Sequence, residues 1–511
     1  MIPKSDNTGR PGLADDTVLA ALQGFAEIPR WLSAFMEPNQ LATSLRRAVP
    51  ELADGRLTLL DCVPQRLRAK GDQWLARCQV TVAAPDGSRR DVVLVGQVMS
   101  PTRSELPEPA VREEPVAFGE PGWSGYLADI RVLLQVQTAD AALPALPTLI
   151  DPTAAAQLLG QCLVSAGHRG VQVLGCTPQV VRYKPGSRCT IVYQMRYLRD
   201  LDGTNPAGRM PLNRLIAKTH EGEKGRVAWQ AMTALWGSPL ARGDVVTVAE
   251  PLAYLPDERI LVQGPVPGER TLKEFARLAL ADGSPAAMTE LRAELGKTAR
   301  GLAALHHSGA RYGRVATLAG ELDEVREVVQ RLSLTVPDVM AAAAPLLYRL
   351  EALDAAVPAD PLVSAHHDFR PAQVLIDSGR VGFIDFDGAG MAEPALDLGR
   401  FQAKLRDIGV STPAPGGRPL GGASLTERLA TVDELCEHFL AVYQDNADVT
   451  PARVELWEAV DLFTALLHTW TKVRLLRVGP RLTVLVDRLR SARLDAVPGI
   501  ESAGAKGVAP R

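Results

Sequence analysis

The stretch that decides the fold lies between residues 366 and 398 and contains three acidic motifs: His366-His367-Asp368-Phe369-Arg370-Pro371-Ala372-Gln373, Ile384-Asp385-Phe386-Asp387 and Glu393-Pro394-Ala395-Leu396-Asp397-Leu398. The apolar runs 374–376 and 381–384 lie between the first two motifs, on either side of the turn-type sequence 377–380. Two short apolar runs around such a turn predict a β-hairpin. The hairpin would hold Asp368 and Asp385 close together.

Carboxylates arranged in this way suit phosphoryl transfer. One carboxylate can orient and deprotonate an attacking hydroxyl, while others hold the Mg2+ that neutralises charge on nucleotide phosphates. A plain surface hairpin with scattered acids is the alternative.

The three motifs resemble the catalytic and metal-binding segments of the aminoglycoside phosphotransferase and small-molecule kinase family, a relative of the protein kinases. That family's pattern is His-x-Asp, four residues and Asn, then Asp-Phe or Asp-Trp, and later Asp-Pro-x-x-Asp. The resemblance implies that Asp368 is the catalytic base and that Asp385 is the principal Mg2+ ligand. It also implies that His366 and Asp397 brace the backbone of the loop.

Two residues depart from the family pattern. Gln373 replaces the metal-binding Asn, and Glu393 replaces the first Asp of the last motif. Gln keeps the amide oxygen that a hard cation prefers but places it one methylene further out. The maltokinase branch of the family also resembles this sequence in having Gln there and an acid after Asp-Phe. We therefore keep Gln373 and Asp387 as expected further Mg2+ ligands.

Length and composition limit the class of protein. A chain of 511 residues suggests two to four domains at roughly 150 residues each. A net charge of −3, without a basic stripe interleaved with aromatics, argues against a nucleic-acid binder. The six cysteines include no Cys-x-x-Cys pair, which argues against a zinc site. No signal-like start and no apolar run near about 18 residues is present, so we expect a cytoplasmic protein without membrane association.

An internal repeat precedes the motifs. Residues 37–70 align without a gap onto residues 151–184, at an offset of 114, with nine identities in 34 positions. The identical pairs are Pro38/Pro152, Ala42/Ala156, Leu45/Leu159, Leu60/Leu174, Cys62/Cys176, Pro64/Pro178, Gln65/Gln179, Arg68/Arg182 and Lys70/Lys184. We interpret a duplicated helix-plus-hairpin unit, with chance similarity as the alternative. The first copy would be a degenerate lobe that serves as a cap or brace.

The second copy continues into the residues expected to bind nucleotide. A turn at Gly186 leads to a strand over 189–197, and a later strand ends at Lys218. The resemblance implies that Lys218 meets the nucleotide phosphates and that the Gly186 turn lies over them. Lys-Pro-Gly-Ser is also an ordinary hairpin loop. Residues 93–97 of the first copy contain no lysine in the comparable strand.

Two further segments bear on nucleotide binding. Related kinases pair the strand lysine with a helix glutamate, but the predicted helix over 224–236 contains no carboxylate, and only Glu221 and Glu223 stand before it. Residues 261–268 resemble the family's hinge between lobes, where backbone groups from Gln263 to Pro265 would take the adenine edge. An ordinary loop is the alternative there.

The C-terminal half is predicted to be helical. We expect helices over 287–306, 322–353 with breaks at Pro337 and Pro345, 426–444, and 451–490 with a break near Gly479 and Pro480. His306 and His307 end the first of these helices without further metal-type residues at ligand spacing. The acidic residues Glu437, Glu455, Glu458 and Asp461 either bind an acceptor amine or polyol or form a solvated face.

The sequence therefore predicts an α+β protein with a protein-kinase-like two-lobed fold and an extra N-terminal module that repeats part of the N-lobe. The expected domains are an accessory module at 1–122, a nucleotide-binding N-lobe at 123–264 and a helical C-lobe at 265–511. The expected activity is transfer of the γ-phosphoryl group of ATP, with Mg2+, to a hydroxyl of a small molecule, with a slight preference for a sugar or sugar-like alcohol.

Two other interpretations stay open. A pseudokinase-type binding or scaffold protein is favoured by Gln373 and by the missing helix carboxylate, and an aminoglycoside phosphotransferase fits the same motifs. A protein kinase fits less well, because no Ala-Pro-Glu segment or activation loop follows Asp385. The sequence leaves open the acceptor, ATP against GTP, and the oligomeric state.

Overall fold

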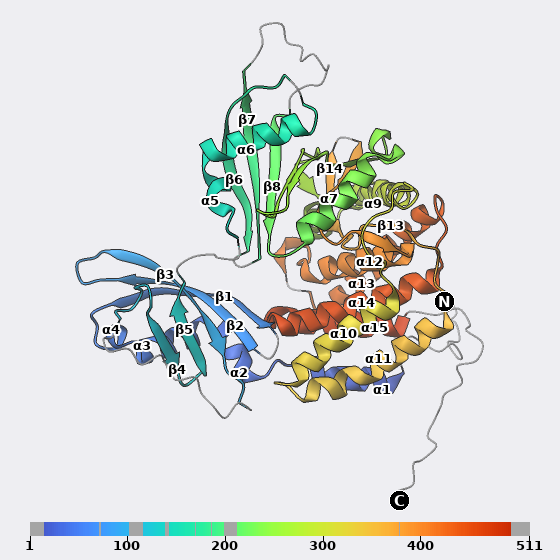
Figure 1. The fold of residues 1–511 in the computed structure, drawn as a ribbon. Helices are drawn as coiled ribbons and strands as arrows, with labels where there is room; N and C mark the ends of the chain where they lie inside the picture. Colours follow the sequence, from blue (N-terminus) through green and yellow to red (C-terminus); the bar gives the residue numbers. More distant parts are fainter. Residues whose placement is uncertain are drawn as a thin grey trace, which may run out of the picture. The chain divides into compact units, whose positions relative to one another are not determined.

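The computed structural model describes residues 15–70, 73–101, 116–137, 143–168, 170–184, 187–198, 212–377, 379–418 and 420–491. These residues form two compact units (Figure 1). The first unit takes its residues from 1–139, 319–358 and 459–511, and the second from 140–318 and 359–458. Both units combine helices with antiparallel sheet, which confirms the predicted α+β class. The division into three consecutive domains stays a prediction.

The first unit contains a five-stranded sheet in the order β1-β2-β3-β5-β4. Its strands are β1 (Thr58–Lys70), β2 (Gln73–Ala83), β3 (Arg89–Val98), β4 (Ser124–Leu127) and β5 (Val132–Val136). Its helices are α1 (Asp16–Ala21), α2 (Arg30–Ser33), α3 (Pro38–Ala48), α4 (Pro50–Ala53), α10 (Leu318–Ser333), α11 (Asp338–Ala356), the end of α14 (Pro451–Thr471) and α15 (Leu475–Ser491). Trp74 on β2 donates a 3.2 Å hydrogen bond to the Thr335 hydroxyl after α10, so segments far apart in sequence share one core.

The second unit begins with the sheet of the predicted N-lobe, in the order β6-β7-β8-β11-β10. Its strands are β6 (Val173–Lys184), β7 (Arg188–Tyr197), β8 (Arg214–His220), β10 (Pro251–Leu255) and β11 (Ile260–Gln263), and its helices are α5 (Leu146–Ile150), α6 (Pro152–Ser165) and α7 (Lys224–Trp236). Every second residue of β7 from Cys189 to Met195 is buried, as expected for a strand with one face on a core.

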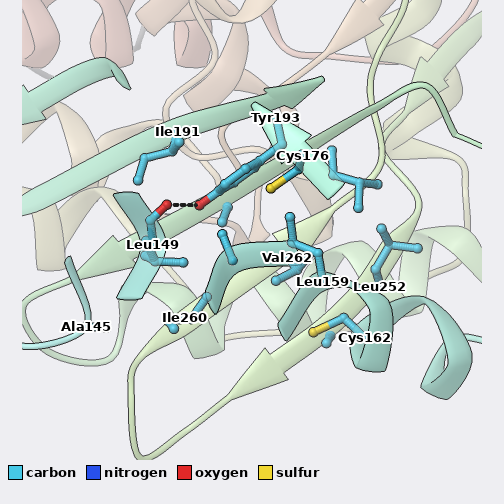
Figure 2. Packing of buried hydrophobic residues seen from close by; sticks show 14 of the residues in the cluster. Ala145, Leu149, Leu159, Cys162, Cys176, Ile191, Tyr193, Leu252, Ile260 and Val262 are labelled. Carbon is cyan, nitrogen blue, oxygen red and sulfur yellow. Dashed lines mark hydrogen bonds between the residues drawn. The ribbon is translucent and has the colours of Figure 1, made fainter. Parts of the chain in front are cut away.

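The core of this lobe lies between the sheet and helices α5 and α6 (Figure 2). Ile191, Tyr193 and Cys176 point from the strands into it, and Leu159 and Cys162 meet them from α6. The hydroxyl of Tyr193 donates a 2.8 Å hydrogen bond to the carbonyl of Leu149, which satisfies the polar end of this buried ring.

The two large sheets have the same strand order, and each follows a helix, α3 before β1 and α6 before β6. The register shift at Leu59/Asp61 on β1 recurs at Val173/Gly175 on β6, which is the sequence offset of 114. Shared topology with a shared bulge supports the interpretation of a repeat. The similarity extends over a whole sheet, beyond the helix and hairpin that the sequence indicated.

The lysine position of β8 has an equivalent in the first sheet. Lys218 lies opposite Thr190 on β7 and Leu261 on β11. The equivalent cysteines Cys62 and Cys176 align the two sheets. In this alignment Gln97 on β3 matches Lys218 on β8, and Gln97 lies opposite Leu75 and Leu133. The first sheet therefore has an uncharged amide where the second has an ammonium group.

The remainder of the second unit is mainly helical. Its helices are α8 (Leu272–Asp282), α9 (Pro285–His306), α12 (Pro394–Ser411), α13 (Ala423–Gln444) and the start of α14, and its short strands are β9 (Val246–Val248), β12 (Arg270–Thr271), β13 (Val363–Ala365), β14 (Val374–Asp377), β15 (Arg380–Phe383) and β16 (Gly390–Ala392). Strands β14 and β15 form the predicted hairpin, with Asp377 opposite Arg380 and Gly379 at a φ of +91° in the turn. This hairpin is confirmed.

Some helix boundaries differ from the sequence expectation. Helix α11 continues through Pro345 and α15 through Pro480, since a proline removes one hydrogen bond but packing can hold the turns on either side. The last break lies instead between α14 and α15, where Val473 has a φ of +45°. Among the described residues, no helix has the length and apolar character needed to cross a membrane.

Candidate active site

The loop that carries Asp368 is anchored by its neighbour Phe369. This ring is fully buried, stacks on Phe401 at 5.4 Å and meets Phe383 edge-on at 4.9 Å. Because both neighbours of Asp368 are buried, the backbone there is fixed, and the Asp368 side chain stays 41% exposed. A carboxylate held by a buried loop and open to solvent can meet a substrate hydroxyl.

Asp397 holds the backbone of the same loop by hydrogen bonds. This fully buried carboxylate accepts hydrogen bonds from the backbone N–H of His366 at 2.7 Å and of His367 at 2.8 Å, and lies 3.2 Å from Nε2 of His306. Burial by itself raises the pKa of Asp397, but the hydrogen bond and charge of His306, with those of His366, outweigh burial and lower it. Asp397 is therefore an anion that fixes two consecutive peptide groups.

His366 and His367 each contact the segment around Asp385. Nε2 of His366 lies 3.0 Å from the carbonyl of Ile384, and its ring lies 4.6 Å from that of Phe386. His367 has a φ of +66°, a conformation that favours glycine, and its Nδ1 lies 2.8 Å from the carbonyl of Gly388. The two loops are thus tied together over their backbones.

Asp385 stands at a strained point directly after β15. Its φ is +73°, and the N–H of the preceding Ile384 donates to the carbonyl of Gln373 at 3.0 Å. Its Oδ2 accepts a 2.9 Å hydrogen bond from Nε2 of Gln373, which also donates to Oδ2 of Asp368 at 3.3 Å. One amide group therefore bridges the predicted base and the predicted metal ligand.

The other carboxylate oxygen of Asp385, Oδ1, accepts a hydrogen bond from Lys218. Nζ of Lys218 lies 2.8 Å from Oδ1 of Asp385 and 3.5 Å from Oδ1 of Asp387. Burial alone would lower the pKa of Lys218, but the charges of Asp387 and Asp385 outweigh burial and raise it. Burial alone would likewise raise the pKa of both aspartates, and the charge of Lys218 lowers it instead. All three groups are charged in this state.

The predicted adenine segment ends strand β11. Gln263 is buried, and the N–H of Gly264 donates a 2.8 Å hydrogen bond to the carbonyl of Glu250. Pro265 has no N–H, so neither Gly264 nor Pro265 offers a free backbone donor to an adenine ring. The predicted phosphate-covering residue Gly186 lies outside the described residues.

Three residues near the aspartates were not identified from the sequence. Arg188 and His220 lie opposite each other on β7 and β8, and both contact Asp387. Arg370 contacts Asp368 at 3.0 Å. A period-two reading of β8 from Lys218 would have found His220, because alternate residues of a strand share a face.

Glu393 has a structural task that explains its greater length. Its carboxylate accepts hydrogen bonds from Nε of Arg453 at 2.8 Å and from Nε1 of Trp457 at 2.6 Å, and all three side chains are buried. The glutamate side chain reaches α14 and pairs with the buried guanidinium of Arg453. A buried guanidinium without such a partner would strongly destabilise the fold.

The predicted acidic acceptor face on α13 and α14 is not uniform. Glu437 is exposed, whereas Asp461 is 5% exposed and Glu458 is fully buried with a 2.5 Å hydrogen bond from Nε of Arg406. Glu458 is thus committed to a buried ion pair and belongs neither to a solvated face nor to an open acceptor site.

Comparisons with known proteins bear on this arrangement. Residues 214–418 match the model of the phosphotransferase enzyme family. This segment contains Lys218, Asp368, Gln373, Asp385 and Asp397. No curated protein matches the chain.

Several solved structures resemble the chain at low identity. A glucosamine kinase in complex with glucosamine, ADP and inorganic phosphate is 17% identical over 88% of this chain and 97% of its own, with a TM-score of 0.42. Choline kinase LicA from Streptococcus pneumoniae is 14% identical over 66% and 99%, with a TM-score of 0.42. An aminoglycoside phosphotransferase from Streptomyces rimosus is 19% identical over 60% and 97%, with a TM-score of 0.34.

Scores and identities of this size say nothing about the substrate. The matched segment includes the acidic motifs for which the sequence predicts a phosphotransferase. The segment 214–418 of this chain therefore matches the phosphotransferase enzyme family, and it contains the acidic motifs of the site.

Proposed function

We propose that this protein transfers the γ-phosphoryl group of ATP to a hydroxyl group of a small molecule. The observation that supports this best is the bridging amide of Gln373, which contacts Asp368 and Asp385 while Lys218 contacts the other oxygen of Asp385. A base, a metal-binding carboxylate and a phosphate-binding ammonium are the groups that phosphoryl transfer requires.

In this proposal Asp368 accepts the proton of the acceptor hydroxyl. Its exposed carboxylate is oriented by Arg370 at 3.0 Å and by Gln373 at 3.3 Å. The buried anchor Phe369 and the clamp of Asp397 on the preceding peptides keep it from moving as the acceptor arrives. Lys218 would steady the phosphates.

Asp385 and Gln373 are the groups that would hold Mg2+; the motif resemblance also implied Asp387 as a further ligand. When bound, Mg2+ supplies neutralisation of phosphate charge. Magnesium is commonly held by one or two carboxylates together with substrate phosphates. Asp385 supplies such a carboxylate, and the adjacent amide of Gln373 contains an oxygen of the kind that Mg2+ prefers.

Gln373 must also change for this role. Its Nε2 now faces two carboxylates, and a cation would need its Oε1 in that place. A rotation of the amide would exchange the two atoms without moving the backbone.

We further propose a sugar or sugar-like alcohol as the acceptor and the cytoplasm as the location. The Gln at position 373 and the additional N-terminal sheet favour this acceptor over an aminoglycoside.

The test measures transfer of radiolabelled γ-phosphate from Mg-ATP to a panel of sugars, amino sugars, choline and aminoglycosides. Asp368→Asn should lower turnover by at least about 100-fold with the Kd for ATP nearly unchanged, because general-base catalysis commonly contributes that much. Asp244→Asn, at an exposed carboxylate, is the matched control and should behave as wild type. Equal turnover in the Asp368 variant would refute the assigned base.

A binding protein without catalysis is the second outcome of the same experiment. Saturating Mg-ATP at 100 times its Kd should stabilise the folded protein by about 2.7 kcal/mol. If neither ATP nor GTP raises the unfolding temperature and no acceptor is labelled, the scaffold interpretation replaces the enzyme.

A further inference from the structure

Lys218 has no carboxylate partner on helix α7. The helix runs from Lys224 to Trp236, is described throughout, and contains neither Asp nor Glu. Glu223, just before it, is exposed and pairs with Arg226, and Glu221 is also exposed. In related kinases a helix glutamate holds the lysine in place. In this chain another group must do so.

Asp387 is surrounded by Arg188, Lys218 and His220 of the sheet. Its Oδ2 lies 3.0 Å from Nη1 of Arg188 and 3.1 Å from Nε2 of His220, and its Oδ1 lies 3.5 Å from Nζ of Lys218. Arg188 and His220 are opposite each other in the β7–β8 ladder, and Lys218 lies two residues before His220. All three therefore project from one face of the sheet toward one carboxylate.

The first turn of the same helix packs near His220. A Cβ at Gly225, in the first turn of α7, would lie 3.5 Å from Nδ1 of His220 and 3.0 Å from the ring of Tyr254. His220 is 2% exposed, and its Nδ1 has no hydrogen-bond partner among the described residues. The His220 ring therefore lies between the start of α7, which is within ordinary contact distance of Nδ1, and Asp387, which contacts Nε2.

In the proposed function, Asp385 gives up its present contact with Lys218 when it binds Mg2+. Both of its oxygens are engaged, Oδ1 by Lys218 and Oδ2 by Gln373. If Asp385 is the Mg2+ ligand of the proposed function, its oxygens must be released to the cation. Lys218 is then left with Asp387, its second carboxylate.

We propose that Asp387 is the carboxylate that positions Lys218 toward the nucleotide, in the role of the absent helix glutamate. Arg188 and His220 are positioning residues that fix Asp387. This assignment rests on the proposed function and replaces the expectation that Asp387 is a metal ligand. Asp387 is well placed to position Lys218, because it lies in the same loop as Asp385 and only two residues after it.

A double-mutant cycle tests the coupling. The Kd of a fluorescent ATP analogue with Mg2+ is measured for wild type, Asp387→Asn, Lys218→Met and the double variant. Asp387→Asn should weaken binding about tenfold or more, the size expected when a charge-assisted contact is lost. In the Lys218→Met background the same change should alter the Kd less than about twofold, because the interaction it removes is already gone.

The metal is measured separately. Mn2+ binding in the presence of ADP, followed by electron paramagnetic resonance, should be nearly unchanged in Asp387→Asn and lost in Asp385→Asn. Equal loss of Mn2+ in both variants would make Asp387 a metal ligand and overturn the inference. Additive effects of the Asp387 and Lys218 changes on nucleotide binding would overturn it as well.

His220 variants separate positioning from packing. His220→Gln keeps a nitrogen donor toward Asp387 and should stay close to wild type, whereas His220→Phe keeps the ring volume and should weaken nucleotide binding about tenfold. Equal Kd values for the two would overturn the role of His220. The double variant Lys218→Met with Asp387→Asn leaves no unpaired charge of this pair, so it is the variant most expected to fold.

Nucleotide and metal binding by the wild-type protein separates a failure of the proposed function from a failure of the Asp387 inference alone. If wild type binds neither ATP nor Mn2+-ADP, the proposed function fails and the inference fails with it. If wild type binds and only the coupling is missing, the inference alone is wrong.

Discussion

Replacement of Asp397 by Asn offers a sharp test of how the loop that carries Asp368 is held. The carboxylate is fully buried and accepts backbone hydrogen bonds from His366 at 2.7 Å and His367 at 2.8 Å. Asparagine has one acceptor oxygen, so its NH2 group would face one of these N–H donors. His367 also has a φ of +66°, a conformation that the lost contact helps to maintain.

The magnitude follows from these contacts. A hydrogen bond to a charged group contributes about 1.5–3 kcal/mol, and a buried N–H left unpaired adds to the loss, so we expect Asp397→Asn to cost about 2–4 kcal/mol. For a unit of this size that corresponds to a fall of roughly 5–10 °C in the transition temperature. Differential scanning calorimetry at about pH 7 measures the transition temperature. This method is chosen because it can resolve separate transitions if the two compact units unfold separately.

The pH dependence gives an independent check. The pKa of Asp397 is lowered in the folded protein from an ordinary value of 3.8, so its stabilisation is present above that value and lost as the pH falls through it toward the folded-state pKa. The difference between wild type and Asp397→Asn should therefore shrink below about pH 4. The exposed control Asp244→Asn should change stability by less than about 0.5 kcal/mol. A cost for Asp397→Asn no larger than that of the control would refute the reasoning.

Three further predictions concern packing and the two departures from the family pattern. Gly399→Ala should destabilise the protein by about 1–3 kcal/mol, because a Cβ there would lie 2.5 Å from a backbone nitrogen of α14. Gly160→Ala, where the added Cβ would meet only a side chain at 3.6 Å, should stabilise it by about 0.5–1 kcal/mol. Thermal unfolding of both variants checks this, and a change of the same sign in both would contradict the explanation. Glu393→Asp should lose about 1–3 kcal/mol, since the shorter side chain leaves the buried Arg453 incompletely paired, and urea unfolding would show no change if that ion pair were unimportant. Gln373→Ala should raise the Mg2+ concentration needed for half-maximal nucleotide binding about tenfold, and an unchanged Mg2+ titration would exclude the amide as a ligand.

The sequence predicted well what depends on neighbours along the chain. The hairpin of β14 and β15 formed as expected, because a two-residue turn between apolar runs has few other ways to pair. Helix α7 matches its predicted bounds for a similar reason, since apolar residues at helical spacing determine a buried face locally. The repeat was visible as identities, but its extent over a full sheet required the strand pairing.

The sequence was less informative where the environment decides. Pro345 and Pro480 were expected to break helices, yet both lie inside them, because tertiary packing outweighs a single lost hydrogen bond. Glu458 was expected either to bind an acceptor or to lie on a solvated face, and only the fold shows that its buried carboxylate accepts a hydrogen bond from Arg406. Residue type alone does not reveal such a partner.

By itself, then, the sequence determined the chemical groups of the site and their local spacing between residues 366 and 398, because those contacts are made within a loop, a hairpin and a helix start. Only the tertiary structure decided which basic side chains contact Asp385 and Asp387. Lys218 and His220 are each 167 residues from their aspartate, and the pairing depends on how a sheet and a distant loop come together. Ion pairs between distant segments follow from packing of the whole unit, which no local pattern encodes.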